Sequence, residues 1–237
     1  MERLDKILAN TGRWSRKEAR ELVRAGRVAV DGVTAQAADG KYDPAARFEV
    51  DGETVSGERL VYLMLHKPAG LVSATEDPRQ PTVLELLPQH LRRVGLFPAG
   101  RLDKDTEGLL LITDDGALSH ALMSPNRHVE KEYEAVVDGA LAADAVLRFE
   151  QGMTLRDGTE CKPAKLEILE TEPELRVRVT LKEGKYHQVK RMIAAVGGTV
   201  TALKRLRLGG LWLDKTLAPG EFRELTQEKL EKLTSKT

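Results

Sequence analysis

The amino-acid sequence predicts an α+β protein, in which a small α/β module precedes a larger domain built on a largely antiparallel, mixed sheet with flanking helices. Three observations support this prediction. The first ~60 residues combine two short helical patterns with two hairpin signals. Beyond them, strand patterns outnumber helical patterns. These strands are joined by hairpin-type connections more often than by strand–helix–strand units, which favours antiparallel pairing.

Helix and turn signals define the first module. Residues 2–9 carry apolar side chains at helical spacing, and Ser15–Glu18 reads as a capping box that opens a second helix ending at Gly26. Alternating segments centred on Asp31-Gly32 and Asp51-Gly52 then predict two β-hairpins.

The second domain begins where the pattern changes after GERL (57–60). YLMLHKP (62–68) is an apolar strand, and KEYEAVV (131–137) and LRVRVTL (175–181) alternate as strands do. Residues 188–196 return to helical spacing. We therefore divide the chain into a module at 1–58, a linker at 59–61 and a domain at 62–237.

The charge of the chain is balanced overall but not locally. Lys plus Arg and Asp plus Glu both total 37. Residues 1–27 hold eight basic and four acidic residues, which gives +4, whereas residues 28–60 hold three basic and seven acidic, which gives −4. A basic segment of this kind is typical of a polyanion-binding surface, and equally of a solvated helix face.

Composition excludes several classes of protein. The single cysteine, Cys161, rules out an internal disulfide and a multi-thiolate metal site, and it suits a reducing compartment. The five histidines lack ligand spacing, so no structural zinc site is expected. No apolar run approaches the ~18 residues that a membrane span needs. We therefore expect a cytoplasmic protein that holds no metal and contacts no membrane.

The acid-rich stretch GRLDKDTEGLLLITDDG (100–116) admits several interpretations. The first interpretation is a calcium loop, because the acids fall on EF-hand ligand positions. Pro98 and Gly100 argue against it, since they occupy the place of the entering helix. The second interpretation is an aspartyl-phosphate phosphatase, because residues 103–106 match the D-x-D-x-T motif. That chemistry needs an apolar strand before the first aspartate, and LFPAGRL is a poor strand. A structural interpretation, in which Asp105 or Thr106 caps a turn before a buried LLLI strand, leaves the spacing of Arg101 and Asp103 unexplained.

The same stretch resembles the signature of the RsuA-type pseudouridine synthases, G-R-L-D-x-x-T-x-G-L-x-x-x-T-x-D-G. Further segments resemble the family in the same order, with Lys185 standing where arginine is commoner. The first 60 residues resemble the S4-type RNA-binding module that precedes this catalytic domain. The further segments are LHKPAGLVSA (65–74), EKEYEA (130–135), EGKYHQVKRMIAAVG (183–197), LKRLRLGGLWL (203–213) and LAPGEFRELT (217–226).

The resemblance implies a reaction and three catalytic residues. A pseudouridine synthase breaks the N1–C1′ bond of a uridine, rotates the base and rejoins it through C5, without a metal or cofactor. Asp103 matches the catalytic aspartate, which acts as a nucleophile at C1′ or as a base at C2′; both routes stay open. Tyr133 matches the tyrosine that stacks on the base and has been proposed to assist proton removal at C5. Lys190 matches the cation that keeps the aspartate ionised.

The resemblance also implies RNA contacts. The target base must be extruded from folded RNA, and Arg101, expected on an extended strand with Asp103, would fill the vacated space. Two further groups of cations are candidates for phosphate contacts. They are Arg3, Arg13, Arg16, Arg20 and Arg24 in the first module, and Lys131, Arg176, Arg178, Arg205 and Arg207 along an RNA track in the second.

The implied substrate is ribosomal RNA within a ribosomal subunit precursor. The short loop TEDPRQPTV (75–83) and the absence of a basic tail favour the branch that modifies uridine 516 of 16S rRNA. The alternatives are the sister branch that acts on 23S rRNA and a non-catalytic rRNA-binding assembly factor. We expect a monomer.

Overall fold

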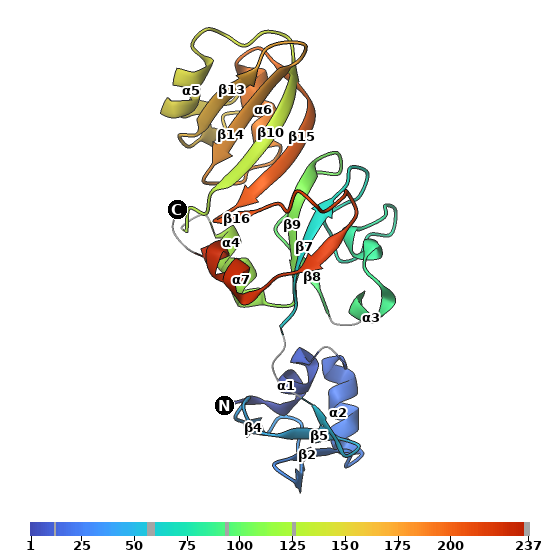
Figure 1. Cartoon of the computed structure of the whole chain (residues 1–237). Coiled ribbons are helices and arrows are strands. Elements are labelled where there is room, and N and C mark those ends of the chain that lie inside the picture. The colour runs from blue at the N-terminus through green and yellow to red at the C-terminus, as the bar shows by residue number, and fades with distance from the viewer. Residues whose placement is uncertain (12, 56–59, 93–94, 125–126, 235–237) are drawn as a thin grey trace. The chain divides into compact units, whose positions relative to one another are not determined.

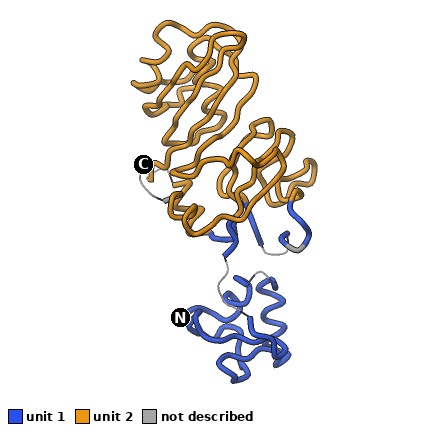
Figure 2. The backbone as a smooth tube through the Cα atoms, viewed as in Figure 1, with its two compact units in different colours: residues 1–62, 87–97, 112–115 blue, residues 63–86, 98–111, 116–237 orange. Residues whose placement is uncertain are grey.

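The computed structural model describes residues 1–11, 13–55, 60–92, 95–124 and 127–234. The chain forms two compact units, coloured separately in Figure 2. The first comprises residues 1–62, 87–97 and 112–115, and the second comprises residues 63–86, 98–111 and 116–237. The joint expected at GERL and most of the linker expected at 59–61 lie outside the described residues or at their edge, so the domain boundary stays a prediction.

The first unit has the predicted helices and hairpins (Figure 1). The capping box is present, because the Glu18 amide donates to Ser15 Oγ at 3.2 Å and the Ser15 amide donates to Glu18 Oε2 at 2.7 Å. Asp31 and Asp51 both take the positive φ that such two-residue hairpin turns require. The elements are β1 (Glu2–Arg3), α1 (Leu4–Asn10), α2 (Arg16–Arg24), β2 (Val28–Val30), β3 (Val33–Thr34), β4 (Lys41–Tyr42), β5 (Phe48–Val50), β6 (Glu53–Val55) and α3 (Gln89–Arg92).

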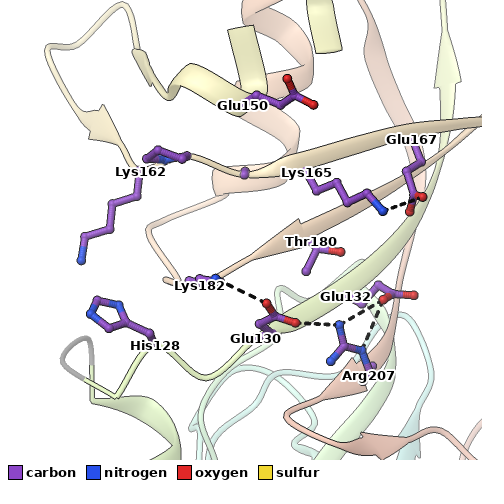
Figure 3. A pocket seen from close by; sticks show the side chains of 12 residues that line it. His128, Glu130, Glu132, Glu150, Lys162, Lys165, Glu167, Thr180, Lys182 and Arg207 are labelled. Atoms are coloured by element: carbon purple, nitrogen blue, oxygen red, sulfur yellow. Dashed lines mark hydrogen bonds and ion pairs between the residues drawn. The ribbon is translucent and has the colours of Figure 1, made fainter. Parts of the chain in front are cut away.

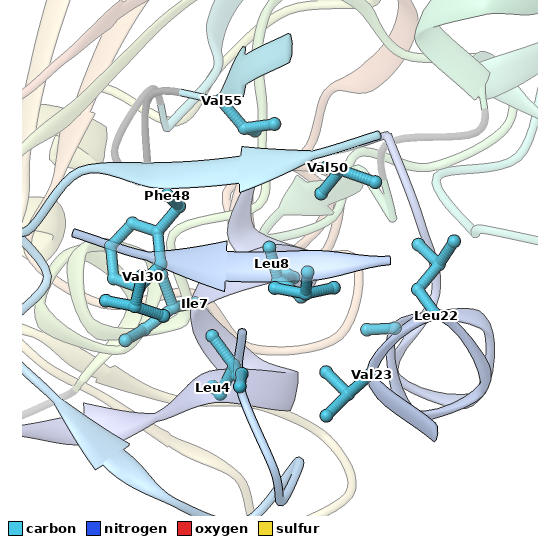
Figure 4. Close-up of a cluster of buried hydrophobic side chains, with 12 residues drawn as sticks. Leu4, Ile7, Leu8, Leu22, Val23, Val30, Phe48, Val50 and Val55 are labelled. Atoms are coloured by element: carbon cyan, nitrogen blue, oxygen red, sulfur yellow. The ribbon is translucent and has the colours of Figure 1, made fainter. Parts of the chain in front are cut away.

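The core of this unit lies between the two helices and a four-stranded sheet of order β3-β2-β5-β6 (Figure 4). Leu4, Ile7 and Leu8 of α1 and Phe48 of β5 are fully buried. Their burial follows from the helical spacing of the apolar residues in α1 and the alternation in β5.

A nine-stranded sheet dominates the second unit, in the order β13-β14-β10-β15-β9-β7-β17, with β16 added to β15 and β8 to β9. The pairs β13–β14, β14–β10, β10–β15, β15–β16 and β7–β17 are antiparallel and the pair β15–β9 is parallel, which confirms the largely antiparallel, mixed sheet. The strands are β7 (Tyr62–Lys67), β8 (Phe97–Ala99), β9 (Glu107–Thr113), β10 (Lys131–Asp138), β13 (Lys165–Glu170), β14 (Leu175–Leu181), β15 (Thr199–Leu208), β16 (Leu211–Trp212) and β17 (Phe222–Glu224).

Shorter elements flank this sheet. Helix α6 (Gln188–Ala195) confirms the helical pattern over residues 188–196, and α5 packs on β13. The others are η1 (Val83–Leu86), α4 (Gly116–Met123), α5 (Ala145–Gln151), β11 (Met153–Thr154), β12 (Glu160–Cys161) and α7 (Gln227–Thr234). Among the described residues, no helix is both long enough and apolar enough to cross a membrane.

The parallel pair β9–β15 brings the acid-rich stretch to the centre of the sheet. Residues 109–112, the LLLI run, are fully buried in β9. Gly108 lies opposite Arg205 at such close range that an added Cβ would stand 2.2 Å from the Arg205 carbonyl oxygen. Gly108 also has φ +107°, so glycine is required there for two independent reasons.

Candidate active site

Asp103 lies on a loop that the fold holds firmly. The loop connects β8, which ends at Ala99, to β9, which begins at Glu107. Ser73 binds it from a neighbouring segment: its hydroxyl accepts from the Leu102 amide at 3.1 Å and donates to the Leu102 carbonyl at 3.0 Å. The Thr106 amide closes a turn by donating to the Asp103 carbonyl. The backbone on both sides of Asp103 is therefore fixed.

Lys67, the last residue of β7, holds the same loop in place. Its side chain is fully buried, and its ammonium donates to the carbonyls of Pro68, Lys104 and Thr106 at 3.0, 3.2 and 2.8 Å. Burial lowers the pKa of Lys67 to about 8, an effect that the nearby carboxylates of Asp105 and Asp103 oppose. Lys67 lies within the family segment LHKPAGLVSA but was not among the expected site residues, although a lysine at the end of an apolar strand needs buried acceptors.

Two basic side chains of the α6 region approach the Asp103 carboxylate. His187 Nε2 lies 3.6 Å from Oδ1, and Lys190 Nζ lies 3.8 Å from Oδ2. The Asp103 side chain is 31% exposed, so the carboxylate is open to a substrate from one side.

Lys190 makes its hydrogen bonds to Asp105, not to Asp103. Its Nζ is 2.6 Å and 2.7 Å from the two Asp105 carboxylate oxygens, and the hydrogen bond holds the pKa of Asp105 below its usual range. Asp105 lies exposed in a turn, as a turn or surface acid would, and its carboxylate also anchors the cation next to Asp103.

Arg101, Asp103 and Tyr133 line one small cavity of about 90 Å³, together with His187. Tyr133 lies on β10 and is 9% exposed, so its ring forms a wall of the cavity. Arg101 is exposed and follows β8 on a segment without regular structure, so the extended strand expected to hold it beside Asp103 is absent. The two side chains nevertheless share this cavity.

A wider hollow of about 460 Å³ shares Arg101, Asp103 and His187 with the small cavity. It adds Lys104 and Tyr186 to the lining. Asp103 is thus accessible through a broader depression that carries both cationic and aromatic side chains.

The remaining acids of the stretch have structural partners. Asp114 accepts a hydrogen bond from the Val61 amide at 2.8 Å, and Asp115 accepts one from the Tyr62 hydroxyl at 2.9 Å. Strands, not helices, precede and follow residues 100–106, which contradicts an EF-hand.

Three of the cations expected along an RNA track are buried. Lys131 is 7% exposed and donates to the Val129 carbonyl, and Arg205 is 2% exposed and donates to the Leu109 carbonyl. Arg207 is 7% exposed and pairs with Glu130 and Glu132. The expectation that these three meet RNA on the surface does not fit their burial. The half-buried Arg176 and Arg178 form ion pairs with glutamates of the sheet.

The five candidate arginines of the first unit are exposed, and three of them surround one buried acid. Arg3, Arg16 and Arg20 lie 3.0, 3.7 and 2.8 Å from the carboxylate of Asp5, which is fully buried. Burial alone would raise the pKa of Asp5, but the hydrogen bonds from Arg3 and Arg20 outweigh it and lower that pKa. Asp5 therefore fixes the three guanidinium groups at one place on the surface. Arg13 and Arg24 are exposed as well.

A larger cavity of about 730 Å³ lies elsewhere in the second unit, and several of its charged side chains pair with one another (Figure 3). Arg207 contacts Glu130 and Glu132, Lys182 contacts Glu130, and Lys165 contacts Glu167. Charges paired in this way stabilise the sheet. The smaller cavity at Asp103, where a half-open carboxylate faces an aromatic ring and two basic groups, is the better candidate for an active site.

The fold and this cavity together define a two-part RNA-modifying enzyme, and comparison with known proteins specifies its family. Residues 61–195 match the model of the RNA pseudouridylate synthase family, and residues 2–39 match the S4 domain. The chain belongs to the RNA pseudouridylate synthase family, and it is of the RsuA type with an N-terminal S4 domain.

Individual relatives cover almost the whole chain. It is 48% identical to an uncharacterized RNA pseudouridine synthase of Bacillus subtilis over 96% of both chains. It is 44% identical to ribosomal small subunit pseudouridine synthase A of Escherichia coli over 96% of this chain and 98% of the relative. A crystal structure of a pseudouridylate synthase superposes with a TM-score of 0.69 at 37% identity, covering 98% of this chain and all of the other.

Proposed function

We propose that this protein isomerises uridine 516 of 16S rRNA to pseudouridine, within a precursor of the small ribosomal subunit. The observation that carries the proposal is the single cavity in which Arg101, Asp103 and Tyr133 meet. The 44% identity to ribosomal small subunit pseudouridine synthase A supports the choice of RNA. The proposal includes action as a monomer, with an RNA-binding module at 1–58 and a catalytic domain at 62–237.

In this proposal the uridine leaves the RNA stack and enters the cavity. Duplex or stacked RNA shields the sugar of a base, so the nucleotide must turn outward before a carboxylate can reach it. Arg101 stands exposed beside Asp103 and takes the space that the nucleotide leaves. Tyr133 lies against the base and holds its plane while the bond to the sugar changes.

Asp103 supplies the carboxylate that the isomerisation needs. It acts either on C1′ as a nucleophile or on C2′ as a base, and both routes need an ionised oxygen next to the sugar. Lys190 approaches the carboxylate without a close hydrogen bond, so its ammonium stabilises the negative charge and leaves the oxygens available. His187 lies at a similar distance from the carboxylate. Tyr133 also faces the carbon that loses a proton once the base is rejoined through C5.

The exposed arginines of the first unit position the RNA in this proposal. Arg3, Arg16 and Arg20, gathered around Asp5, and the exposed Arg13 and Arg24 are suited to phosphate contacts. Such contacts raise affinity and set orientation without reading sequence.

Single-turnover assays with transcripts of 16S and 23S rRNA fragments test the proposal. The purified protein is expected to form pseudouridine in the 16S fragment that contains uridine 516, and not in a copy that carries cytidine there. Asp103→Asn should abolish the product while RNA affinity stays within about twofold, because an uncharged amide of the same shape cannot act on the sugar. Asp138→Asn, an exposed change on the strand that bears Tyr133, is the matched control and should retain full activity.

Three outcomes would contradict this proposal. Product in the 23S fragment alone would reject the target, and product from Asp103→Asn would reject the residue. If the unmodified protein bound the RNA but formed no pseudouridine, the result would favour an assembly factor that only binds rRNA.

A further inference from the structure

Tyr186 is an exposed aromatic residue at the edge of the candidate active site. Its side chain is 75% exposed, whereas Tyr133 is 9% exposed. The ring stacks on His187, with ring centroids 3.8 Å apart and an interplanar angle of 17°. One face of the tyrosine is therefore covered by the histidine, and most of the rest of the ring meets solvent.

The loop that carries this pair is held in place by buried hydrogen bonds. Gln188 Nε2 donates to Glu183 Oε1 at 2.6 Å, and the Lys185 amide donates to Gln188 Oε1 at 2.9 Å. Both Glu183 and Gln188 are more than nine-tenths buried. These bonds fix the turn on which the Tyr186 and His187 rings stand.

Further contacts fix the two aromatic residues themselves. Arg191 Nη1 donates to the Tyr186 carbonyl at 3.2 Å. His187 has a left-handed backbone with φ 47°, a conformation that costs a non-glycine residue about 1–3 kcal/mol and persists only where its surroundings impose it. An exposed ring whose backbone is fixed in this way loses little freedom when something stacks on it.

The position of the pair relates it to the chemistry. Tyr186 and His187 line the 460 Å³ hollow that also contains Asp103, Arg101 and Lys104. Tyr186 additionally lines a cavity of about 380 Å³ with Arg156, Asp157 and Arg191, and Arg191 forms an ion pair with Asp157. Tyr186 thus presents an aromatic surface in two hollows that basic residues also line. Proteins hold unpaired nucleotides on such surfaces, where the ring stacks on the base and the cations contact the phosphates.

From this arrangement we infer that Tyr186, supported by His187, is a stacking subsite for an unpaired base adjacent to the target uridine. The inference rests on the proposed function. A flipped nucleotide leaves its neighbours without a stacking partner, so one of them presents a free face beside the cavity. The Tyr186 ring replaces the lost stacking.

The experiment uses short RNA hairpins that carry the target uridine and the full-length protein. In a first series, 2-aminopurine replaces each flanking base in turn, and its fluorescence reports stacking on the protein. The unmodified protein should change the fluorescence at one flanking position. Tyr186→Ala should abolish that change and lower kcat/KM by about tenfold, mainly through KM, whereas Tyr186→Phe keeps both near the original values. Trp212→Ala is the matched control, since Trp212 is 53% exposed but lines none of these cavities.

A double-mutant cycle separates stacking from a role in holding the loop. An abasic nucleotide at the reported position should cost the unmodified protein about tenfold in kcat/KM and cost Tyr186→Ala almost nothing more. Additive losses would overturn the inference, as would a Tyr186→Ala variant that matches the unmodified protein in both readouts.

The experiment distinguishes failure of the proposed function from failure of this inference. If the unmodified protein forms no pseudouridine in any hairpin, the proposed function is rejected and the subsite with it. If product forms normally but Tyr186→Ala changes neither fluorescence nor KM, only the subsite is rejected.

Discussion

Lys190 lies between two aspartates of one loop and binds the one that the proposed chemistry does not use. Its Nζ is 2.6 Å from Asp105 but 3.8 Å from Asp103. Asp105 is 72% exposed, so it anchors the ammonium from the solvent side. Asp103 experiences the positive charge without giving its lone pairs to a close hydrogen bond. A carboxylate in this environment keeps its oxygens free to react.

This relationship predicts different consequences for replacing Lys190 and for replacing Asp105. Lys190→Met removes the charge beside the reacting carboxylate and should lower the single-turnover rate about 100-fold. Asp105→Asn removes only an exposed ion pair, which contributes below ~1 kcal/mol, and should lower the rate by less than about fivefold. Pseudouridine yield over time in one RNA fragment measures both. Equal losses in the two variants would show that Asp105 does more than anchor Lys190.

The buried clamp formed by Lys67 predicts a loss of stability. Lys67→Met leaves the carbonyls of Pro68, Lys104 and Thr106 without their donor. The buried Thr106 contact costs ~1–3 kcal/mol and the two part-buried contacts add less, so the free energy of unfolding should fall by roughly 2–4 kcal/mol. Urea unfolding of a Trp14→Phe background measures it, because Trp212 then reports the second unit alone. Lys104→Met alters an exposed side chain of the same loop and should change stability by less than ~0.5 kcal/mol. A Lys67→Met variant as stable as this control would contradict the clamp.

Burial of Lys131 predicts that stability rises at alkaline pH. Burial, and then the charge of Arg205, lower the pKa of Lys131 from 10.5 to about 8. Between these two values the unfolded chain binds a proton that the folded chain has released. The free energy of unfolding should therefore increase with pH in this window, by at most about 1.4 kcal/mol per pH unit.

Lys131→Met lacks the titrating amine. Comparing the stability of this variant with that of the unmodified protein therefore measures the contribution of Lys131 to the pH dependence. The stability difference, variant minus unmodified protein, should decrease as pH rises from below 8 towards 10.5. Lys67 titrates in both proteins and cancels in the difference. A stability difference that does not change with pH would show that folding does not lower the pKa of Lys131.

The close approach at Gly108 predicts a severe effect of one methyl group. Gly108→Ala places Cβ 2.2 Å from the Arg205 carbonyl oxygen and adds strain at φ +107°, so β9 and β15 must separate. We expect a loss of about 3 kcal/mol or more in thermal unfolding of the second unit. Gly116→Ala begins α4, where an added Cβ meets nothing within 4 Å, and should be neutral or slightly stabilising. Similar melting temperatures for the two variants would refute the argument.

Local signals in the sequence predicted much of the fold. The capping box at Ser15–Glu18, the turns at Asp31 and Asp51 and the strand of residues 131–137 depend on neighbouring residues, and all of them are present. The meeting of Arg101, Asp103 and Tyr133 was expected from resemblance to a family and not from spacing. The parallel pairing of β9 with β15 joins segments about 95 residues apart, and no local pattern specifies it.

The arginines of β15 show why side-chain environment was harder to predict. Arg205 and Arg207 alternate like solvent-facing residues, yet a register shift places Arg205 opposite Tyr133 and Arg207 opposite Glu132. Because Tyr133 and Glu132 are consecutive, they face opposite sides of the sheet, and so do the two arginines. Both faces are covered at this point, so both guanidinium groups are buried. A bulge depends on tertiary packing and leaves no mark in an alternating sequence.

The pairing of β17 with β7 makes completion of the sheet depend on a strand that is synthesised long after its partner. Phe222 pairs with Leu65, 157 positions earlier in the chain. While the intervening residues are being translated, β7 lacks one of its two neighbours and presents unpaired backbone groups. Contacts of such sequence separation form slowly, and an uncovered strand edge invites association with other chains. The interval between the synthesis of β7 and that of β17 is therefore the period in which the nascent chain is most vulnerable to aggregation.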